Sequence, residues 1–235
     1  MTVNKTELFE TAIGKEIQFK EYDAEELLMI GEFIGHNPLF FKEIYKTHQN
    51  REIKVEHKAS MGAAVAITFN YKTAEVRMKR DKVEMKLTMD LFLQFMSLVD
   101  ACFLEMIPAG SVVDVDLHFS SPATRELFEK DSRGALIIIN ERKVSLEGNL
   151  SKFVVDYIGS LWPLGSPNTT KPVYLTNAII NNIVHRGMSN ELEKEVSLRF
   201  KLDAIEQKKK SIAFLTSKEI DEIRELEQKN KEESR

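Results

Sequence analysis

Three ionisable side chains recur at every second position in Asp114-Val115-Asp116-Leu117-His118. In an extended strand, residues two apart point to the same face, so Asp114, Asp116 and His118 would lie together. Two carboxylates on one face can share a metal ion or a proton. The same alternation is typical of an edge strand with one solvent-exposed face. The sequence also indicates no third metal ligand nearby. We favour the solvent face and keep a small-molecule site on these three residues as an alternative.

The other reactive residue types show no catalytic spacing. The five histidines form no HExxH or HxH pattern, and the chain has no glycine-rich nucleotide loop and no GxSxG motif. The single cysteine, Cys102, falls on the apolar stripe of an expected helix, which favours a core position over a nucleophile. One cysteine cannot form an internal disulfide, which fits a reducing compartment. The sequence therefore predicts that the protein is no enzyme and holds no cofactor and no metal.

Composition and charge exclude further classes of protein. The 235 residues are 43% hydrophobic and 30% charged, and the formal net charge is -4. This is typical of a globular protein, and an acidic balance argues against general nucleic-acid binding, which needs a basic face. The first ten residues contain no apolar signal-peptide core, and no apolar stretch reaches the roughly 20 residues of a membrane span. We expect a cytoplasmic protein with no membrane insertion and no nucleic-acid partner.

The first hundred residues mix helix and strand patterns. Residues 16–22 alternate like a strand, Asp23 is an expected N-cap with Gly35 ending its helix, and Pro38 begins a second helix. Thr88 is the expected N-cap of a long, largely buried helix from Met89 to Glu105. Between these helices we expect strands in residues 52–59, 63–72, 74–80 and 82–88, the last two forming a hairpin with one apolar and one charged face.

The second half is expected to be richer in strands. Residues 134–140 (GALIIIN) show no alternation, which indicates a central strand covered on both faces. Helices are predicted in residues 120–131, in residues 176–187 and from residue 190 onwards. Further strands are predicted in residues 112–119, 142–148, 152–161 and 171–176.

These patterns predict an α+β fold. It would consist of two small α/β halves with mostly antiparallel sheets and a helical C-terminal tail. We expect an N-terminal domain over residues 1–105, a second α+β domain over 106–205 and a polar tail over 206–235.

Trp162 is the only tryptophan and precedes a turn that contains Pro163 and Gly165. A tryptophan beside such a turn commonly fills a structural corner, where it buries a large apolar area. Tryptophan is also enriched at the energetic centres of protein interfaces. We favour the corner and keep the interface as the alternative.

Four segments of the second half occur in an order typical of a known family. They are residues 106–115 (MIPAGSVVDV), 135–144 (ALIIINERKV), 154–167 (VVDYIGSLWPLGSP) and 173–200 (VYLTNAIINNIVHRGMSNELEKEVSLRF). Together they resemble a domain-of-unknown-function family found in Gram-positive type VII secretion loci, beside toxins with an LXG targeting domain. The resemblance covers about residues 105–205, and residues 116–134 are longer than the corresponding family segment.

The family resemblance singles out eight positions. The family's Leu-Pro-x-Gly-Ser opening and its Tyr-Asp-Tyr-x-x-x-x-Tyr-Pro-x-Gly segment are both matched, with Trp162 where tyrosine is more frequent. We take the matching residues as candidates for partner binding: Pro108, Gly110, Ser111, Asp156, Tyr157, Trp162, Pro163 and Gly165.

The resemblance implies a chaperone-like accessory or adaptor protein in the cytoplasm. Such a protein would bind an LXG-type toxin, or its small helical partners, for type VII secretion. No catalytic residue carries over from the family. Two alternatives stay open at this point: an immunity protein that neutralises a toxin of the same locus, and a small-molecule-binding protein.

Overall fold

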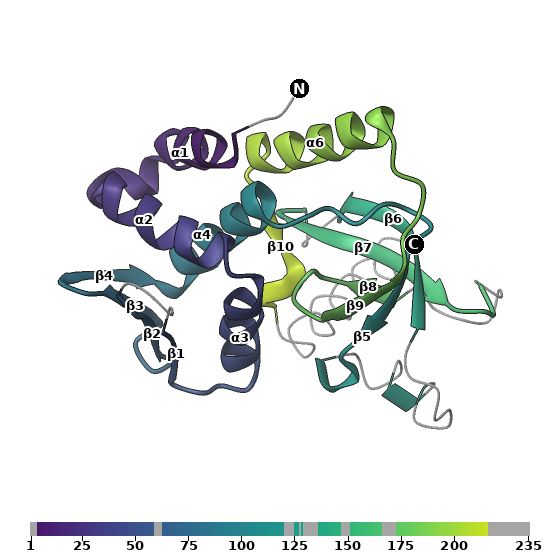
Figure 1. Ribbon diagram of the computed structural model, residues 1–235. Helices are drawn as coiled ribbons and strands as arrows, with labels where there is room; N and C mark the ends of the chain where they lie inside the picture. The colour runs from purple at the N-terminus through teal and green to yellow at the C-terminus, as the bar shows by residue number, and fades with distance from the viewer. Residues whose placement is uncertain are drawn as a thin grey trace, which may run out of the picture. The chain divides into compact units, whose positions relative to one another are not determined.

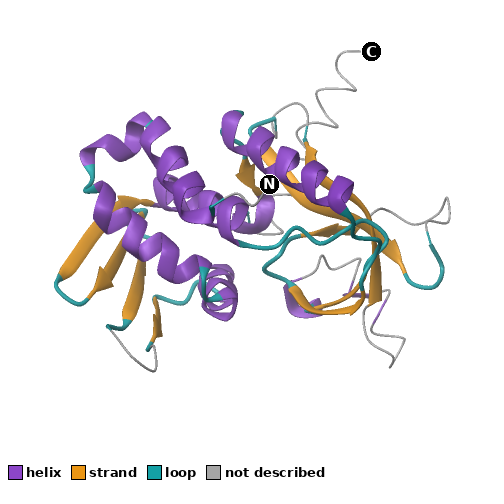
Figure 2. Cartoon of the chain, turned by 45° about the horizontal axis from the view of Figure 1, so that its top comes forward, coloured by secondary structure: helices purple, strands orange, loops and turns teal. Residues whose placement is uncertain are grey.

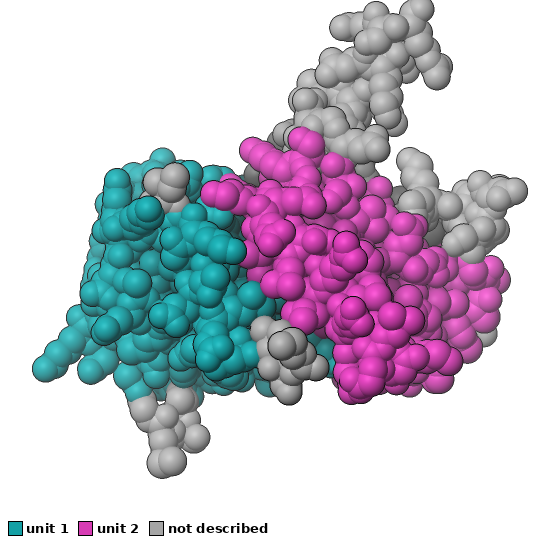
Figure 3. Space-filling model, turned by 90° about the horizontal axis from the view of Figure 1, so that it is seen from above, with its two compact units in different colours: residues 1–105 teal, residues 106–235 magenta. Residues whose placement is uncertain are grey.

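The computed structural model describes residues 4–58, 63–119, 125, 126, 128, 136–146, 151–165 and 173–215. Within these residues the chain combines helices with antiparallel sheets, so the predicted α+β class is confirmed. The chain divides into two compact units, Met1–Glu105 and Met106–Arg235, coloured separately in Figure 3. The predicted helix over residues 120–131 falls mostly outside the described residues, as does the end of the predicted helical tail, residues 216–235.

Three helices of the first unit begin where the sequence predicts: α2 (Ala24–Gly35), α3 (Pro38–Gln49) and α4 (Met89–Phe103). The structure adds two that the sequence analysis did not predict, α1 (Lys5–Lys15) and η1 (Ile17–Glu21). The Asp23 side chain caps α2 by accepting hydrogen bonds from the backbone N–H groups of Glu25 and Glu26, at 2.9 and 3.1 Å. The Thr88 hydroxyl caps α4 by accepting the Leu91 N–H at 3.2 Å.

Two local predictions in the first unit are wrong. Residues 17–21 form the 3-10 helix η1 rather than a strand. Among the described residues they pair with no strand, and the Phe19 ring packs on Phe95 of α4. Gly35 is the last residue of α2 rather than the residue that follows its C-cap (C′), and His36 is the C-cap. A Cβ atom on Gly35 would meet the Phe103 ring at 2.2 Å. The glycine is therefore needed for close packing of α2 on α4 rather than for ending the helix.

The four predicted strands of the first unit form one antiparallel meander. Its strands are β1 (Lys54–His57), β2 (Val65–Asn70), β3 (Glu75–Arg80) and β4 (Val83–Thr88), in that order. Helices cover one face of this sheet, as Figure 2 shows. Val76 and Met78 are buried on the covered face, whereas Arg77 and Lys79 point to solvent. This confirms the predicted hairpin with one apolar and one charged face.

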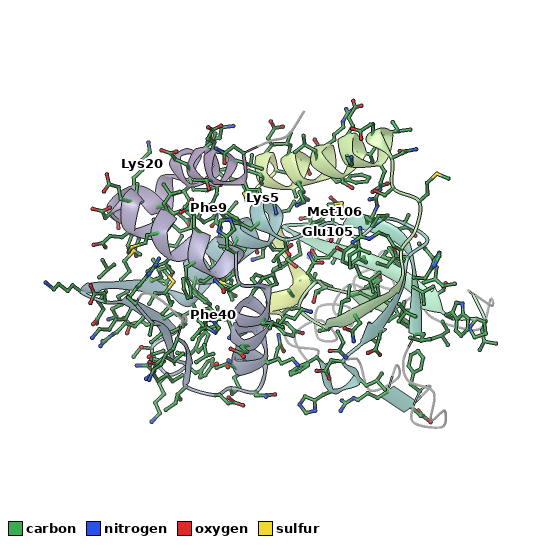
Figure 4. The ribbon with its side chains drawn as sticks, in the orientation of Figure 1. Lys5, Phe9, Lys20, Phe40, Glu105 and Met106 are labelled. Atoms are coloured by element: carbon green, nitrogen blue, oxygen red, sulfur yellow. The ribbon has the colours of Figure 1, made fainter. Side chains whose placement is uncertain are left out.

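Phenylalanine rings fill the space among the helices. The Phe9 ring packs edge-to-face on the Phe95 and Phe103 rings, with centroids 5.8 and 5.2 Å apart, and Phe19 packs on Phe95. Phe9 lies among the helices in Figure 4, where the exposed Lys20 extends away from them. Cys102 is 2% exposed on α4, as expected of a core residue. The first unit is thus built on an aromatic core.

The second unit contains one six-stranded sheet. Its strands are β5 (Val112–Val115), β6 (Leu136–Ser145), β7 (Phe153–Leu161), β8 (Val173–Leu175), β9 (Ile180–His185) and β10 (Lys210–Ser211). The order is β10-β7-β6-β5-β9, and β8 also pairs with β7. Strand β8 pairs with β7, and β9 pairs with β5 on the other side of β6. Because only the four residues 176–179 connect β8 to β9, the sheet must curl toward itself (Figure 1). The described part of the predicted central strand, residues 136–140, lies in β6 between β5 and β7.

Three predictions in the second unit need correction. Residues 180–185 are strand β9 rather than part of a helix, because Ile183 pairs with Val113 and the β-branched side chains suit a sheet. In the described part of 134–148, the two predicted strands are one strand, β6, with an irregularity in its pairing between Ile139 and Glu141. The strand predicted to reach Phe119 ends at Val115, and the 3-10 helix η2 (Leu117–Phe119) follows.

The helix α6 (Glu191–Glu206) lies along the second unit's sheet. The buried Arg142 guanidinium on β6 pairs with the Glu193 carboxylate and donates to the Ser197 hydroxyl at 2.9 Å. After α6 the chain continues through β10 and the 3-10 helix η4 (Ile212–Phe214). The helix predicted from residue 190 onwards therefore ends at Glu206, and the described part of the predicted helical tail beyond it is not an α-helix. Among the described residues, no helix combines the length and the hydropathy that crossing a membrane requires.

Candidate functional site

The motif that begins at Pro108 forms a tight turn before β5. Gly110 has φ 79°, a conformation that favours glycine, and its N–H donates to the Ile139 carbonyl at 2.7 Å. The Ile139 N–H donates in turn to the Ser111 carbonyl at 2.9 Å. Pro108 is buried and Ser111 is fully buried. Gly110 and Ser111 therefore attach the turn to β6, and the Pro108 carbonyl accepts the Ser111 N–H within it at 3.3 Å.

The same turn holds the segment that leads from β9 to α6. The Ser111 hydroxyl accepts the Gly187 N–H at 2.9 Å. A Cβ atom on Gly187 would come within 2.1 Å of the Ala109 carbonyl oxygen, so only glycine fits there. The turn and Gly187 together fix the chain just before the exposed Met188.

Tyr157 occupies the middle of β7 and is 1% exposed. Its hydroxyl donates to the Asn177 side-chain oxygen at 2.7 Å and accepts the Ile107 N–H at 3.1 Å. Both hydrogen bonds join parts of the second unit that are distant in sequence. Ile107, which precedes the Pro108–Ser111 turn, is therefore linked directly to the centre of β7.

Asp156 lies beside Tyr157 and is also 1% exposed. Its carboxylate pairs with the Lys143 ammonium at 2.7 Å, and the Lys143 side chain is only 6% exposed. The carboxylate also accepts the Asn177 N–H at 3.3 Å and the Ser211 hydroxyl at 3.2 Å. A buried carboxylate needs such compensation, because desolvation of an unpaired charge is costly. Asp156 thus connects β6, the segment after β8, and β10.

The residues that follow β7 lie at the surface instead. Trp162 is 49% exposed and Leu164 is 71% exposed, with the exposed Pro163 between them in a cis Trp162–Pro163 peptide. The Trp162 N–H donates to the Leu136 carbonyl at 2.9 Å. The Gly165 N–H donates to the Leu161 carbonyl at 2.7 Å, and Gly165 has φ 74°. We call Trp162–Leu164 the tip.

The tip does not fit the interpretation of Trp162 as a corner filler. A filler would bury its indole, whereas half of the Trp162 side chain faces solvent. Backbone hydrogen bonds at Trp162 and Gly165 attach both sides of the tip to the end of the sheet. The arrangement presents an aromatic and an aliphatic side chain on a fixed support, which is a favourable geometry for protein recognition.

The eight motif residues therefore occupy two kinds of position. Pro108, Ser111, Asp156 and Tyr157 are buried, and Gly110 supports their turn. Three others form or end the exposed tip: Trp162, Pro163 and Gly165. The structure brings the buried positions together through Ile107, Asn177 and Ile139, and keeps the tip at the end of the same strand.

The carboxylates of the Asp-Val-Asp segment do not share a strand face. Asp114 belongs to β5, but Asp116 follows its end and His118 lies in η2. The Asp116 carboxylate accepts the His118 N–H at 3.1 Å, and the Asp114 carboxylate accepts from the Asn181 amide at 3.5 Å. Within the described ranges, no three His, Cys, Asp or Glu residues are grouped so that they could hold a metal ion. The predicted shared face is wrong, because the strand ends too early.

Sequence reasoning missed the partners of the buried motif. Lys143 was expected on an ordinary strand, yet it has φ 45° and its ammonium reaches Asp156. The neighbouring Arg142 pairs with Glu193 on α6, and its guanidinium lies 5.6 Å from the Phe200 ring centroid. A strand pattern in residues 142–148 carries no signal for this irregular backbone, so neither contact could be read from it.

Other apolar side chains are exposed near the start of α6. Val184, Met188 and Leu192 are 58%, 81% and 66% exposed. They are aliphatic or thioether side chains, whereas the tip carries a tryptophan, the residue type most enriched at energetic centres of interfaces. The tip is therefore the stronger candidate for a binding site.

Comparison with known proteins adds one finding. Searches among curated proteins and among solved structures gave no match to the chain. Residues 106–196 match one family model, and this range contains all eight motif residues, the buried positions and the tip alike. The match lies within the stretch whose motifs carry the resemblance described above. The second unit thus contains a region similar to the family described as Domain of unknown function (DUF4176).

Proposed function

We propose that the protein is an adaptor that binds another protein through the tip. The observation that carries the proposal is the exposure of Trp162 and Leu164 beside a strand whose centre is fully buried. A half-exposed tryptophan on a fixed support can bury its indole in a partner at little cost in conformational entropy. The part of the chain that the structure describes offers no group of metal ligands as a competing site.

The partner that we propose is an LXG-type toxin or its small helical partners. The support for this choice is the motif resemblance to proteins of type VII secretion loci. Seven of the ten residues that the two family motifs specify are identical in this chain, and Ile107, Val155 and Trp162 differ. In this proposal the protein acts in the cytoplasm, is no enzyme, and binds its partner before export. The apolar tip suits such a role, because an export partner must cover apolar surface reversibly.

Co-expression with the LXG protein encoded in the same locus tests this proposal. We expect the two proteins to elute as one complex in size-exclusion chromatography, and export of the LXG protein to fail when this chain is deleted. Separate elution together with unchanged export would contradict the proposal.

Pull-downs with the separated toxin fragments distinguish an adaptor from an immunity protein. An adaptor for export is expected to bind the LXG targeting domain. Binding to the isolated toxin domain, with rescue of cells that express that domain, would identify an immunity protein instead.

A further inference from the structure

The last described residues lie against the beginning of β7. After α6 the chain turns at Lys208, which has φ 53°, and β10 then runs parallel to β7. Lys210 pairs with Phe153 and Ser211 pairs with Val154, and the Lys210 N–H donates to the Lys152 carbonyl at 3.0 Å. We call Lys210–Leu215 the strap.

The strap covers an apolar part of β7. Ile212 is 4% exposed and forms a core cluster with Phe153 and Val155. Four partly buried apolar residues pack against this cluster: Leu146, Ile158, Tyr174 and Leu215. Removal of the strap would therefore expose both the edge of β7 and the apolar side chains beside it.

The Ser211 side chain joins the strap to the buried network. The Ser211 hydroxyl donates to the Asp156 carboxylate at 3.2 Å and accepts the Ala213 N–H at 3.1 Å. The charge of Asp156 is balanced by Lys143, and Asn177 also donates to it. Because Lys143 and Asn177 lie outside the strap, they continue to compensate the Asp156 carboxylate when the strap leaves.

We propose that the strap is a detachable element. It opens and closes over the Phe153–Val155 edge of β7 as one unit, while β5 to β7 stay folded, and the Ser211–Asp156 hydrogen bond latches it closed. The pairing of β10 covers two residues of β7, whereas β6 pairs with β7 over seven positions. Elements with short ladders and few apolar anchors open at lower free energy than the rest of a fold. This device goes beyond the proposed function, because it controls a surface distinct from the tip.

Hydrogen exchange of the full-length chain, followed by mass spectrometry, tests the strap. We expect the amides of residues 210–215 to exchange faster than those of β6 and β7, with a rate that depends little on urea. Local opening exposes little surface, so its dependence on denaturant is weak. Exchange of the strap and of β7 at one rate, with one urea dependence, would overturn the proposal.

The Ser211→Ala variant tests the latch. Loss of a hydrogen bond to a carboxylate is expected to accelerate exchange in the strap by roughly tenfold and to leave β6 unchanged. Ser160→Ala is the matched control, because Ser160 is a buried serine on β7 that pairs with Asn140 rather than with the strap. If Ser211→Ala accelerated β6 and the strap equally, the strap would not be a separate unit.

Discussion

The two units differ in the contacts that lie at their centres. In the first unit the ion pairs Lys54–Glu56, Arg77–Glu84 and Lys86–Glu75 occupy exposed or partly exposed positions of the sheet, as the pair Lys194–Glu191 does on α6 of the second unit. In the second unit the pair between Lys143 and Asp156 is 6% and 1% exposed. The first unit is held together at its centre by phenylalanine rings, such as Phe9 and Phe95, with edge-to-face contacts.

This difference separates two ways of stabilising a small domain. Aromatic packing adds free energy in proportion to buried area and tolerates exposed charges on the other face of a sheet. A buried ion pair contributes little net stability, but the loss of one partner leaves an uncompensated charge. The first unit should therefore be sensitive to volume, and the second unit to charge balance.

The largest loss of stability is expected from a cavity in the aromatic core of the first unit. Phe95→Ala removes a fully buried ring that contacts Phe9 and Phe19. We expect the free energy of unfolding of this unit to fall by about 4–5 kcal/mol, measured by urea denaturation. A loss below about 1 kcal/mol would contradict the comparison of the two units, because the aromatic core would then contribute little to the stability of the first unit.

The next effect concerns charge balance in the second unit. Asp156→Ala leaves the Lys143 ammonium buried without its carboxylate, and we expect a loss of about 3 kcal/mol in denaturation experiments. The double variant Lys143→Met with Asp156→Leu removes both charges and should regain most of this loss. If the double variant were as unstable as Asp156→Ala, cavity formation rather than charge would explain the effect.

The same contrast explains how much of the fold could be predicted. Apolar side chains at helix or strand spacing predicted α2, α3, α4 and the meander of the first unit, and a side-chain cap marked the starts of α2 and α4. The ends of these elements were predicted less well: α4 was expected to reach Glu105 and ends at Phe103. Local periodicity is informative when apolar packing dominates.

The second unit was harder to predict, because its contacts are distant in sequence. Residues 180–185 have a pattern that suits a helix until their pairing with β5 is known. The Lys143 ammonium that pairs with Asp156 belongs to a residue with a left-handed backbone conformation, and the local sequence pattern does not predict that conformation. The exposure of Trp162 likewise depends on the hydrogen bond from its N–H to Leu136. The family motif contains both buried and exposed residues, and the sequence alone did not distinguish the two kinds.

A smaller effect concerns a polar group in the otherwise aromatic first unit. The Tyr71 hydroxyl donates to the Glu52 carbonyl at 3.1 Å, and burial raises the pKa of Tyr71 to about 12. Because the folded-state pKa exceeds the unfolded value near 10, the protonated phenol stabilises the unit below about pH 10, and this contribution is lost as the pH rises toward 12. The difference in phenolate absorbance between the wild type and Tyr71→Phe should show a midpoint near 12. A titration midpoint near 10 would mean that the Tyr71 hydroxyl is not shielded from solvent, and would contradict the raised pKa.

The central claim is that the tip binds a partner while the buried motif supports it. Measuring the affinity of Trp162→Ala for the co-expressed LXG protein, together with its free energy of unfolding, tests that claim directly. We expect the affinity to fall by roughly 30-fold or more, as at an interface hot spot, and the stability to change by less than about 1.5 kcal/mol, because half of the indole is already exposed. Leu192→Ala, which changes an exposed residue outside the tip, should leave the affinity unchanged. Unchanged affinity of Trp162→Ala together with a stability loss of about 3–5 kcal/mol would contradict the account and identify Trp162 as a structural residue.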